Sequence, residues 1–371
     1  MMIPPPASLQ ARQAGLRAAL AARGLDGLLV ESLPNVTYLT GLHASAGVVL
    51  FVQQARLIVD GRYGTVGRTL QEQTGAFDLV VLAVGQSYDD IVIRELRALA
   101  GLRIGFEESC MTVRRHRTLL AATPADGAIA ELVPADGLVE GLRMVKDAWE
   151  VDRLREGCRR LSEVAKCILP RVLAGQRERD VAAGIEQELR RAGFDRPAFD
   201  TIVAAGPNAA LPHHRAGDRR IEAGDLVVLD FGGVFQGYCT DISRTVIVPP
   251  AGREAVALVE RVREAHGAAI DAARPGAAPE AVDAAARDLL ERAGLADRFT
   301  HGTGHGLGLE VHERPRLTWA RPGHPEAALT PGMVFTVEPG VYLPGWGGVR
   351  IEDDVLVTPA GPEVLTGGGT E

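Results

Sequence analysis

Several features that define particular classes of protein are scarce in this sequence of 371 residues. Its four cysteines, Cys110, Cys158, Cys167 and Cys239, are scattered and form no Cys-x-x-Cys pair. Such spacing is typical of reduced, mostly buried thiols and argues against the disulfide framework of a small secreted domain. The sequence also has no apolar run of about eighteen residues, so we expect no segment that spans a bilayer.

An excess of positive charge is lacking as well. Lysine and arginine total 40 against 48 aspartate and glutamate, which gives a formal net charge of -8, and no long basic run occurs. We therefore expect no nucleic-acid partner and no attachment to an acidic membrane surface. Met1–Gln10 contains three prolines and no basic segment followed by an apolar one. We expect no secretory signal there, and hence a cytoplasmic protein.

The composition is otherwise that of a folded globular protein, with 46% hydrophobic and 24% charged residues. In the first part of the chain, helical patterns alternate with short β-branched runs, which predicts a mixed α/β domain over residues 1–140. The predicted helices are Ala11–Ala22, Asp89–Leu99 and Val113–Ala122, and the predicted strands are Gly47–Val52, Leu57–Val59 and Leu79–Val84.

The second predicted domain, residues 141–371, begins with a long helix. Asp147 and Glu150 have the spacing of a capping box at its start, and Pro170 should kink or end it. The chain then repeats itself. Gly175 and Gly193 bracket one helical segment, and Gly276 and Gly294 bracket another at the same spacing.

After each of these helices comes a strand opened by glycine that reaches an acid six residues later, in Gly224–Asp230 and Gly332–Glu338. A turn and a second strand with another acid follow each time, at Asp241 and Glu352. Although glycine-rich turns before strands are common, two matching spacings and matched acids predict a duplicated helix–hairpin unit.

The two predicted hairpins carry four acids. Residues opposite one another in an antiparallel pair point to the same face, with Cβ atoms about 4.5–5.5 Å apart. The neighbours of these acids are apolar, so the strands should be buried, and a buried carboxylate needs compensation. Arg244 and Arg350 supply some positive charge. Two divalent cations would balance all four negative charges.

The segment His301–His312 offers a nitrogen ligand. Its four glycines exclude a stable helix, and therefore the His-Glu-x-x-His zinc helix, although His301 and His305 are four residues apart. Carboxylates with one imidazole and no thiolate suit manganese, cobalt, iron or zinc in a catalytic site. Metals held in this way can polarise a carbonyl and activate water near neutral pH.

At these residues the sequence resembles the pita-bread metallopeptidases, in particular aminopeptidase P (Xaa-Pro aminopeptidase) and prolidase (Xaa-Pro dipeptidase). The resemblance lies in FDTIVAAGPNAALPHH, GDLVVLDFGG, TDISRT, HGTGHGLGLEVHE, TVEPGVY and GGVRIED, and more loosely in PNVTYLTGL, SAGVVL and DGRY. It implies an α/β (α+β) architecture: a smaller creatinase-like domain, then a pita-bread catalytic domain whose two halves are related by a pseudo-twofold axis.

The resemblance also implies roles for individual residues. The ligands of two divalent metals, with manganese the first expectation, would be Asp230, Asp241, His305, Glu338 and Glu352. Asp241 and Glu352 would bridge the metals, and Glu338 would also accept a proton from the attacking water. The catalytic histidines would be His213 and His312, with His301 as a third histidine of the pocket. Arg316 would face the substrate carboxylate and Arg350 would support the ligands. We expect His214 to be a solvated loop residue.

The function implied by this resemblance is hydrolysis of the bond between an amino-terminal residue and a following proline. Proline has no N–H and a fixed φ, so the extended binding used by general peptidases does not suit it. Prolidase activity on Xaa-Pro dipeptides is the alternative, and a non-catalytic peptide-binding protein of the same fold is a more distant one. A metal-independent hydrolase would have no use for the full ligand set. The resemblance further implies a homodimer with proline-containing peptides as substrates.

Overall fold

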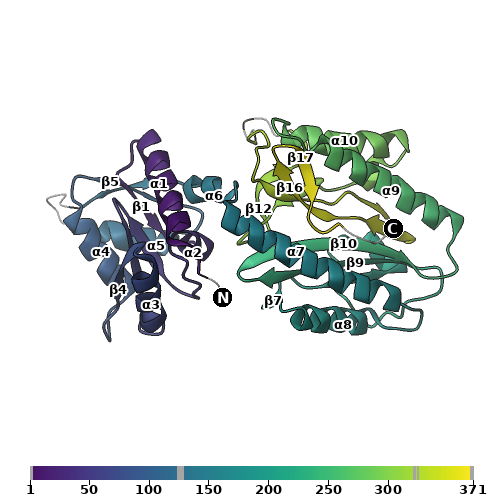
Figure 1. Ribbon diagram of the computed structural model, residues 1–371, viewed down its shortest axis with the longest axis horizontal. Helices are drawn as coiled ribbons and strands as arrows, with labels where there is room; N and C mark the ends of the chain where they lie inside the picture. Colours follow the sequence, from purple (N-terminus) through teal and green to yellow (C-terminus); the bar gives the residue numbers. More distant parts are fainter. Residues whose placement is uncertain (1–2, 123–128, 321–322, 324–325, 368–371) are drawn as a thin grey trace. The chain divides into compact units, whose positions relative to one another are not determined.

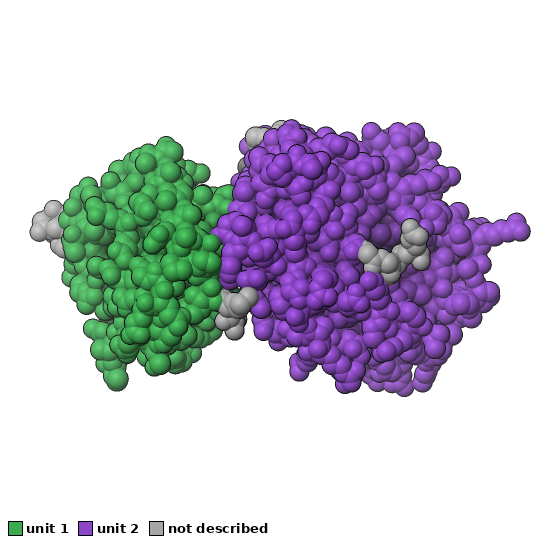
Figure 2. Space-filling view, viewed as in Figure 1, with its two compact units in different colours: residues 1–143 green, residues 144–371 purple. Residues whose placement is uncertain are grey.

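The computed structural model describes residues 3–122, 129–320, 323 and 326–367. The chain forms two compact units, residues 1–143 and 144–371 (Figure 2). Within the described residues, no helix is both long and apolar enough to cross a membrane.

Unit 1 is a six-stranded sheet with helices packed on it (Figure 1). The strand order is β4-β3-β2-β1-β5-β6, with antiparallel pairing at β1–β2 and β2–β3 and parallel pairing elsewhere. This confirms the predicted mixed α/β character. The elements are α1 Pro6–Ala22, β1 Gly27–Val30, α2 Leu33–Thr40, β2 Val48–Phe51, β3 Ala55–Val59, α3 Gly64–Thr74, β4 Phe77–Val81, α4 Tyr88–Ala98, β5 Arg103–Phe106, α5 Val113–Ala121, β6 Glu131–Pro134 and α6 Leu138–Arg143.

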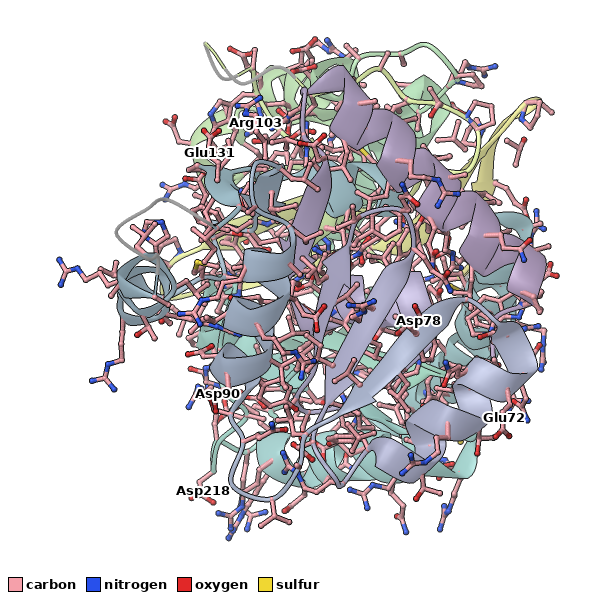
Figure 3. The ribbon with its side chains drawn as sticks, turned by 90° about the vertical axis from the view of Figure 1, so that its left-hand side faces the viewer. Glu72, Asp78, Asp90, Arg103, Glu131 and Asp218 are labelled. Carbon is pink, nitrogen blue, oxygen red and sulfur yellow. The ribbon has the colours of Figure 1, made fainter. Side chains whose placement is uncertain are left out.

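Local sequence explains where these elements begin and how they are finished at the surface. Helix α4 starts at a capping box in which Ser87 accepts from the backbone N–H of Asp90 and the Asp90 carboxylate accepts from that of Ser87. At the edge of the sheet, Arg103 of β5 pairs with Glu131 of β6 at 3.3 Å, and both are directly opposite in the parallel register (Figure 3).

Unit 2 consists of two halves with the same sequence of elements: two helices followed by a sheet. The first half contains α7 Ala148–Ile168, α8 Glu178–Arg191, β7 Arg196–Pro197, β8 Ile202–Ala205, β9 Leu226–Phe235 and β10 Tyr238–Ile247, with short 3-10 turns at Leu169–Arg171 and Gly206–Ala210. The second contains α9 Arg253–Ala272, α10 Pro279–Arg292, a 3-10 turn at Ala296–Arg298, β11 Gly304–Gly306, β12 Glu313–Leu317, β13 Val334–Val337, β14 Gly340–Leu343, β15 Gly347–Arg350, β16 Asp353–Thr358 and β17 Gly361–Val364.

Each half has its own sheet. In the first, β9 lies between β10 and β7, and β8 also pairs with β9; in the second, the order is β12-β11-β13-β16-β17. Hairpin β14–β15 is a separate two-stranded ribbon. An isolated bridge between Ser243 of β10 and Glu352 joins the two sheets. The predicted duplication is therefore present in the fold.

The helices of unit 2 follow the predicted signals. Asp147 and Glu150 form the capping box of α7, which ends at Ile168, two residues before Pro170. One apolar core lies in each half. In the first, Leu161, Ile185, Leu229 and Phe231 are fully buried, and in the second Val262, Leu290, Phe335 and Val337 are fully buried. Helices and sheet pack together in each of these cores, which fixes where the residues of the two sheets lie.

Candidate metal centre and active site

One cavity of about 690 Å³ in unit 2 brings together the predicted site residues. It is lined by all ten of them, namely Asp230, Asp241, His305, Glu338, Glu352, His213, His301, His312, Arg316 and Arg350. They come from both halves of the unit, although up to 139 positions separate them in the chain, from His213 to Glu352. The juxtaposition is a consequence of the fold.

In the first half, Asp230 and Asp241 lie on one face of hairpin β9–β10. Asp230 is opposite Ser243 and Asp241 is opposite Gly232, so the two acids are diagonal neighbours. They are offset by two residues from a directly opposite pair, because the turn at Gln236–Gly237 fixes the register. The face is unaffected, since side chains alternate with a period of two.

In the second half, Glu338 and Glu352 lie just outside the strands. β13 ends at Val337 and β16 begins at Asp353, and these two residues are the last paired positions of the ladder. Glu338 therefore lies one residue after the end of β13, and Glu352 lies one residue before the start of the neighbouring strand β16. Hairpin β14–β15 is inserted between them, which explains why the sequence between Glu338 and Glu352 is longer than that between Asp230 and Asp241.

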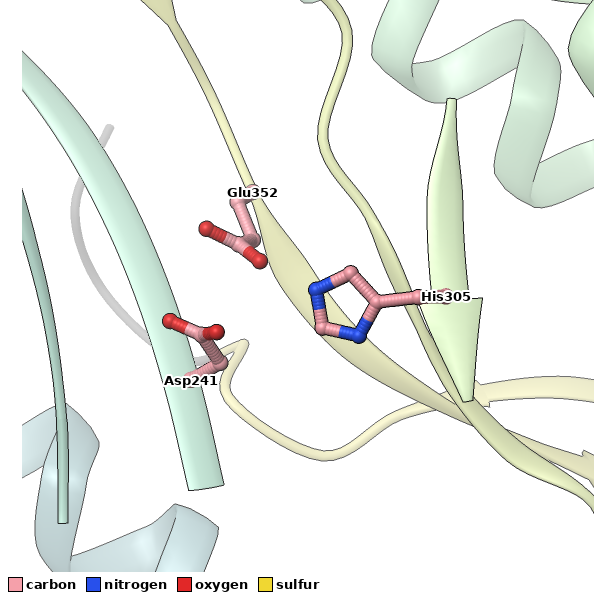
Figure 4. A group of neighbouring side chains, drawn as sticks. All are labelled: Asp241, His305 and Glu352. Atoms are coloured by element: carbon pink, nitrogen blue, oxygen red, sulfur yellow. The ribbon is translucent and has the colours of Figure 1, made fainter. Parts of the chain in front are cut away.

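Three of the expected ligands converge most closely. One ligand atom from each of Asp241, His305 and Glu352 lies within 4.8 Å of the others (Figure 4). They reach this point from β10, β11 and the residue before β16. Figure 4 shows both carboxylates and the imidazole directed into the same space. Two oxygen donors and one nitrogen donor at this spacing fit a divalent metal ion.

The electrostatics of the cluster call for cations. Asp241 is 5% and Glu352 2% exposed. Burial beside other acids raises the pKa of both well above the ordinary range, and burial raises the pKa of Glu338 to about 8. Atom Oδ1 of Asp230 and Oδ1 of Asp241 are buried without a hydrogen-bond partner in the described part of the chain. Buried oxygens left unpaired are costly, so the cluster fits divalent ions that these atoms would bind.

A backbone contact determines which ring nitrogen of His305 faces the acids. Its Nδ1 lies 3.0 Å from the carbonyl oxygen of Gly306 and donates to it, which leaves the lone pair of Nε2 directed toward Glu338, 3.4 Å from its Oε1. Burial lowers the pKa of His305 to about 4, so the ring is neutral at pH 7. Fixing the tautomer through the second nitrogen is how metal-binding histidines are usually oriented.

Arg350 connects acids of the two halves. Its guanidinium forms a short ion pair with Asp230, donates to the Tyr342 hydroxyl at 2.8 Å and donates to Ser243 Oγ at 3.1 Å. Ser243 in turn donates to Oε2 of Glu352 at 2.6 Å. One buried cation thus orients acids from both halves. It is 3% exposed and fully engaged, which suits ligand support.

The remaining histidines surround the acids. His301 donates from Nδ1 to the Gly302 carbonyl at 2.8 Å and accepts at Nε2 from Tyr342, also at 2.8 Å. His312 packs edge-on against His305, with ring centroids 4.3 Å apart. His213 and His312 are exposed to the cavity. Burial lowers the pKa of His301 to about 4 and lowers that of His312, so both rings are neutral at pH 7.

His214 differs from its expected role as a solvated loop residue. It lines the same cavity, and its Nε2 lies 2.8 Å from Oε2 of the fully buried Glu178. Glu178 also accepts from the backbone N–H groups of Ala205 and Gly217 at 2.9 and 3.1 Å. The carboxylate at the start of α8 therefore holds the loop that carries His213.

Sequence reasoning missed three residues of the site: Tyr342, Ser243 and Glu178. Tyr342 and Ser243 fall inside the stretches TVEPGVY and TDISRT that carried the family resemblance, so a search of those stretches for hydroxyl groups would have found them. Glu178 gives no such signal. It lies 35 positions before His213 in an ordinary helical segment, and only the tertiary structure brings it to the loop.

Comparison with known proteins identifies both units of the chain. Residues 152–359 match the model of "Metallopeptidase family M24", and residues 12–145 match the "Creatinase/Prolidase N-terminal domain". The uncharacterized peptidase YqhT of Bacillus subtilis is 38% identical over 352 residues, which cover 95% of this chain and 96% of YqhT.

Two solved structures have the same fold over nearly their whole length. The Xaa-Pro dipeptidase from Bacillus anthracis superposes with a TM-score of 0.90 at 35% identity, covering 98% of this chain and 99% of that one. The X-Pro aminopeptidase from Thermotoga maritima gives 0.84 at 30% identity, covering 96% and 98%. With its creatinase-like domain, pita-bread catalytic domain and cluster of acids suited to divalent metal, the chain belongs to metallopeptidase family M24.

Proposed function

We propose that this metallopeptidase is an Xaa-Pro aminopeptidase, which hydrolyses the bond between an amino-terminal residue and a following proline. The observation that carries the proposal is the convergence of four acids and one imidazole at the buried end of a cavity whose walls hold four more histidines. The names of the similar proteins, an Xaa-Pro dipeptidase and an X-Pro aminopeptidase, support the choice of proline. We assign catalysis to residues 141–371.

The residues that would hold two divalent ions are Asp230, Asp241, His305, Glu338 and Glu352. Manganese is our first choice, with cobalt, zinc and iron as alternatives, because the donors are oxygen and imidazole nitrogen without thiolate. When bound, such ions polarise the substrate carbonyl and lower the pKa of water to near neutral.

Glu338 is placed to move protons. It lies at the cavity end of β13, with Oε1 3.4 Å from Thr336 Oγ1, and burial gives its carboxyl a high affinity for a proton. A carboxylate in this position can accept the proton of the attacking water and later deliver it to the proline nitrogen that leaves. The proline nitrogen needs this proton because an unprotonated amide anion is a poor leaving group.

The histidines supply hydrogen bonds to the substrate. His312 is neutral at pH 7 and exposed to the cavity, so its ring N–H can donate to the carbonyl oxygen as negative charge develops there. His213 faces the same space from the loop held by Glu178. Phe199, Ile202 and Val311 add an apolar wall that suits the proline ring.

A second candidate, Xaa-Pro dipeptidase activity, has an observation in its favour. Arg316 lines the cavity opposite His305 in the β11–β12 register, where it can meet the terminal carboxylate of a dipeptide. The chemistry would be the same in both cases. We also propose a homodimer, by analogy with the family resemblance, which gel filtration with light scattering tests. We further propose a cytoplasmic location, because the scattered cysteines are typical of reduced thiols.

The test uses metal-stripped protein incubated with Ala-Pro and with Ala-Pro-Ala before and after addition of manganese. Release of alanine from Ala-Pro-Ala only after metal addition is expected for the aminopeptidase. Cleavage of Ala-Pro with little turnover of Ala-Pro-Ala would instead identify the dipeptidase. The same test is repeated with cobalt, zinc and iron. If neither peptide is cleaved with any of the four metals, the proposed function is wrong and a peptide-binding role becomes the better account.

A further inference from the structure

The exposed rim of the active-site cavity holds an aromatic side chain that the proposed chemistry does not use. Trp319 lies two residues beyond the end of β12, lines the cavity and is 49% exposed. Tryptophan presents a large apolar surface, and removing apolar surface from water is favourable. A half-exposed indole on the wall of a substrate cavity is therefore available to a bound peptide.

Trp319 is held in place by a stack of charged and aromatic groups. The guanidinium carbon of Arg287, on α10, lies 5.4 Å from the Trp319 ring and 4.2 Å from the ring of Phe299. Arg287 donates to both carboxylate oxygens of Asp283 at 3.0 Å and to the carbonyl oxygens of Phe299 and His301 at 3.0 and 2.8 Å. A guanidinium fixed by four hydrogen bonds provides a rigid support for the indole.

The same segment is pressed against the loop of His301. A Cβ atom at Gly302 would lie 2.9 Å from the Leu317 carbonyl oxygen and 3.0 Å from Thr318 Cβ. Only glycine permits this approach without displacing backbone. The position of Trp319 relative to His301 is thus defined by packing on one side and by Arg287 on the other.

Charge indicates which end of a peptide reaches this rim. The acids lie at the buried end of the cavity, whereas Arg316 is exposed on β12 three residues before Trp319. Leu317 is fully buried, so Arg316 and Thr318 point to the opposite, cavity-facing side of the strand. The carboxyl-terminal part of a peptide carries negative charge and should lie toward Arg316, which places the residue after proline near Trp319.

We propose that Trp319 forms the subsite for the residue that follows proline and favours an apolar side chain there. This inference rests on the proposed function, since it presumes that peptides longer than Xaa-Pro enter the cavity. It adds a specificity that the metal ligands and histidines do not provide. The substrate class it names is Xaa-Pro-Yaa peptides in which Yaa is aliphatic or aromatic.

The first experiment compares Ala-Pro-Leu, Ala-Pro-Gly and Ala-Pro with the manganese-loaded full chain. We expect kcat/KM for Ala-Pro-Leu to exceed that for Ala-Pro-Gly by about tenfold, the effect of covering an aliphatic side chain on one face. Trp319→Ala should reduce this ratio to about twofold. Trp319→Phe should keep most of the preference, because it retains an aromatic surface.

The matched control is Trp346→Ala, which removes the other large aromatic at a comparable exposure of 40%, in the β14–β15 turn and away from the residues that line the cavity. It should leave the ratio as it is. An active Trp319→Ala protein with an unchanged Leu/Gly ratio overturns the proposal. A change in the preference for the first residue instead, measured with Leu-Pro-Gly against Ala-Pro-Gly, overturns it as well.

A binding measurement separates this proposal from the proposed function. The chain has three tryptophans, so replacing Trp149 and Trp346 by phenylalanine leaves Trp319 as the single tryptophan. We expect Pro-Leu to change its fluorescence at a concentration about tenfold lower than Pro-Gly does. Absence of any Pro-Leu response overturns the subsite. A response from a protein that hydrolyses no Xaa-Pro peptide supports the subsite and refutes the hydrolysis.

Discussion

Removal of the divalent ions should leave a protein whose stability decreases as the pH rises. Without cations, the buried acids at the end of the cavity can remain together only by holding protons. Raising the pH removes those protons and leaves like charges close to one another in a site shielded from water. The experiment therefore removes the metal ions with a chelator, varies the pH and measures the free energy of unfolding.

The magnitude follows from Glu338. Its pKa rises from 4.5 to about 8 on folding, and the pKa values of Asp241 and Glu352 rise well above their ordinary range. An acid with a raised folded-state pKa binds protons better when folded, so the stability it contributes is present below its unfolded pKa and is lost as the pH rises through the folded value. At about 1.4 kcal/mol per pKa unit, one such carboxyl accounts for up to about 5 kcal/mol between pH 4.5 and 8.

A loss of this size is comparable to the whole free energy of unfolding of many domains, about 5–15 kcal/mol. Urea unfolding in excess chelator at pH 5, 6, 7 and 8 should show the midpoint falling at each step. With manganese in place of chelator the midpoint should rise with pH, because metal ions displace the protons and bind the ionised acids.

Two variants test the origin of the slope. Glu338→Gln removes one titrating group and should flatten the pH dependence of the metal-free protein. Glu72→Gln, on the exposed surface of α3, should leave it unchanged (Figure 3). Metal-free stability that is constant or increases between pH 5 and 8 would refute the argument that the acids are held together by protons.

Three further predictions concern single residues. Glu338→Ala should lose at least one metal ion and all turnover; two ions per chain by elemental analysis would contradict the ligand assignment. His312→Ala should keep its metal and lose about 10²–10³ in kcat, the scale for one donor to a developing charge, and an unchanged rate would place His312 outside the chemistry. Lys146→Met should destabilise unit 2 by about 3–5 kcal/mol, because Lys146 pairs at 3.1 Å with the buried carboxylate of Glu313, next to His312. Lys146→Arg should restore much of that stability in the same urea titration.

Local signals in the sequence determined much of the fold. Asp147 and Glu150 predicted the start of α7, and Pro170 predicted its end, because capping and proline geometry act over a few residues. The glycine spacings revealed the duplication, since each left-handed turn requires glycine at the same place in both halves. Gly175, Gly193, Gly276 and Gly294 all adopt positive φ.

Register and insertion were decided by tertiary structure. The pattern of acids and apolar neighbours predicted that Asp230 and Asp241 share a face, but the exact pairing depends on the turn at Gln236–Gly237, where Gln236 itself has positive φ. Likewise, the sequence between Glu338 and Glu352 read as one hairpin, whereas the ladder β13–β16 stops and a separate ribbon is inserted. The geometry of these turns depends on the packing around them, and residue type alone does not determine it.

The amino-acid sequence by itself determined which acids and histidines belong to the site. Acids in strands of apolar residues stand out, because a buried carboxylate is costly unless a cation compensates its charge. Only the tertiary structure decided how they are oriented. Arg350 links Asp230 to Glu352 through Ser243, Glu178 holds the His213 loop, and Arg287 supports Trp319, each across dozens of residues. Such contacts depend on where the two sheets and their helices meet. The spacing of residues along the sequence does not determine how far apart they lie in the folded protein.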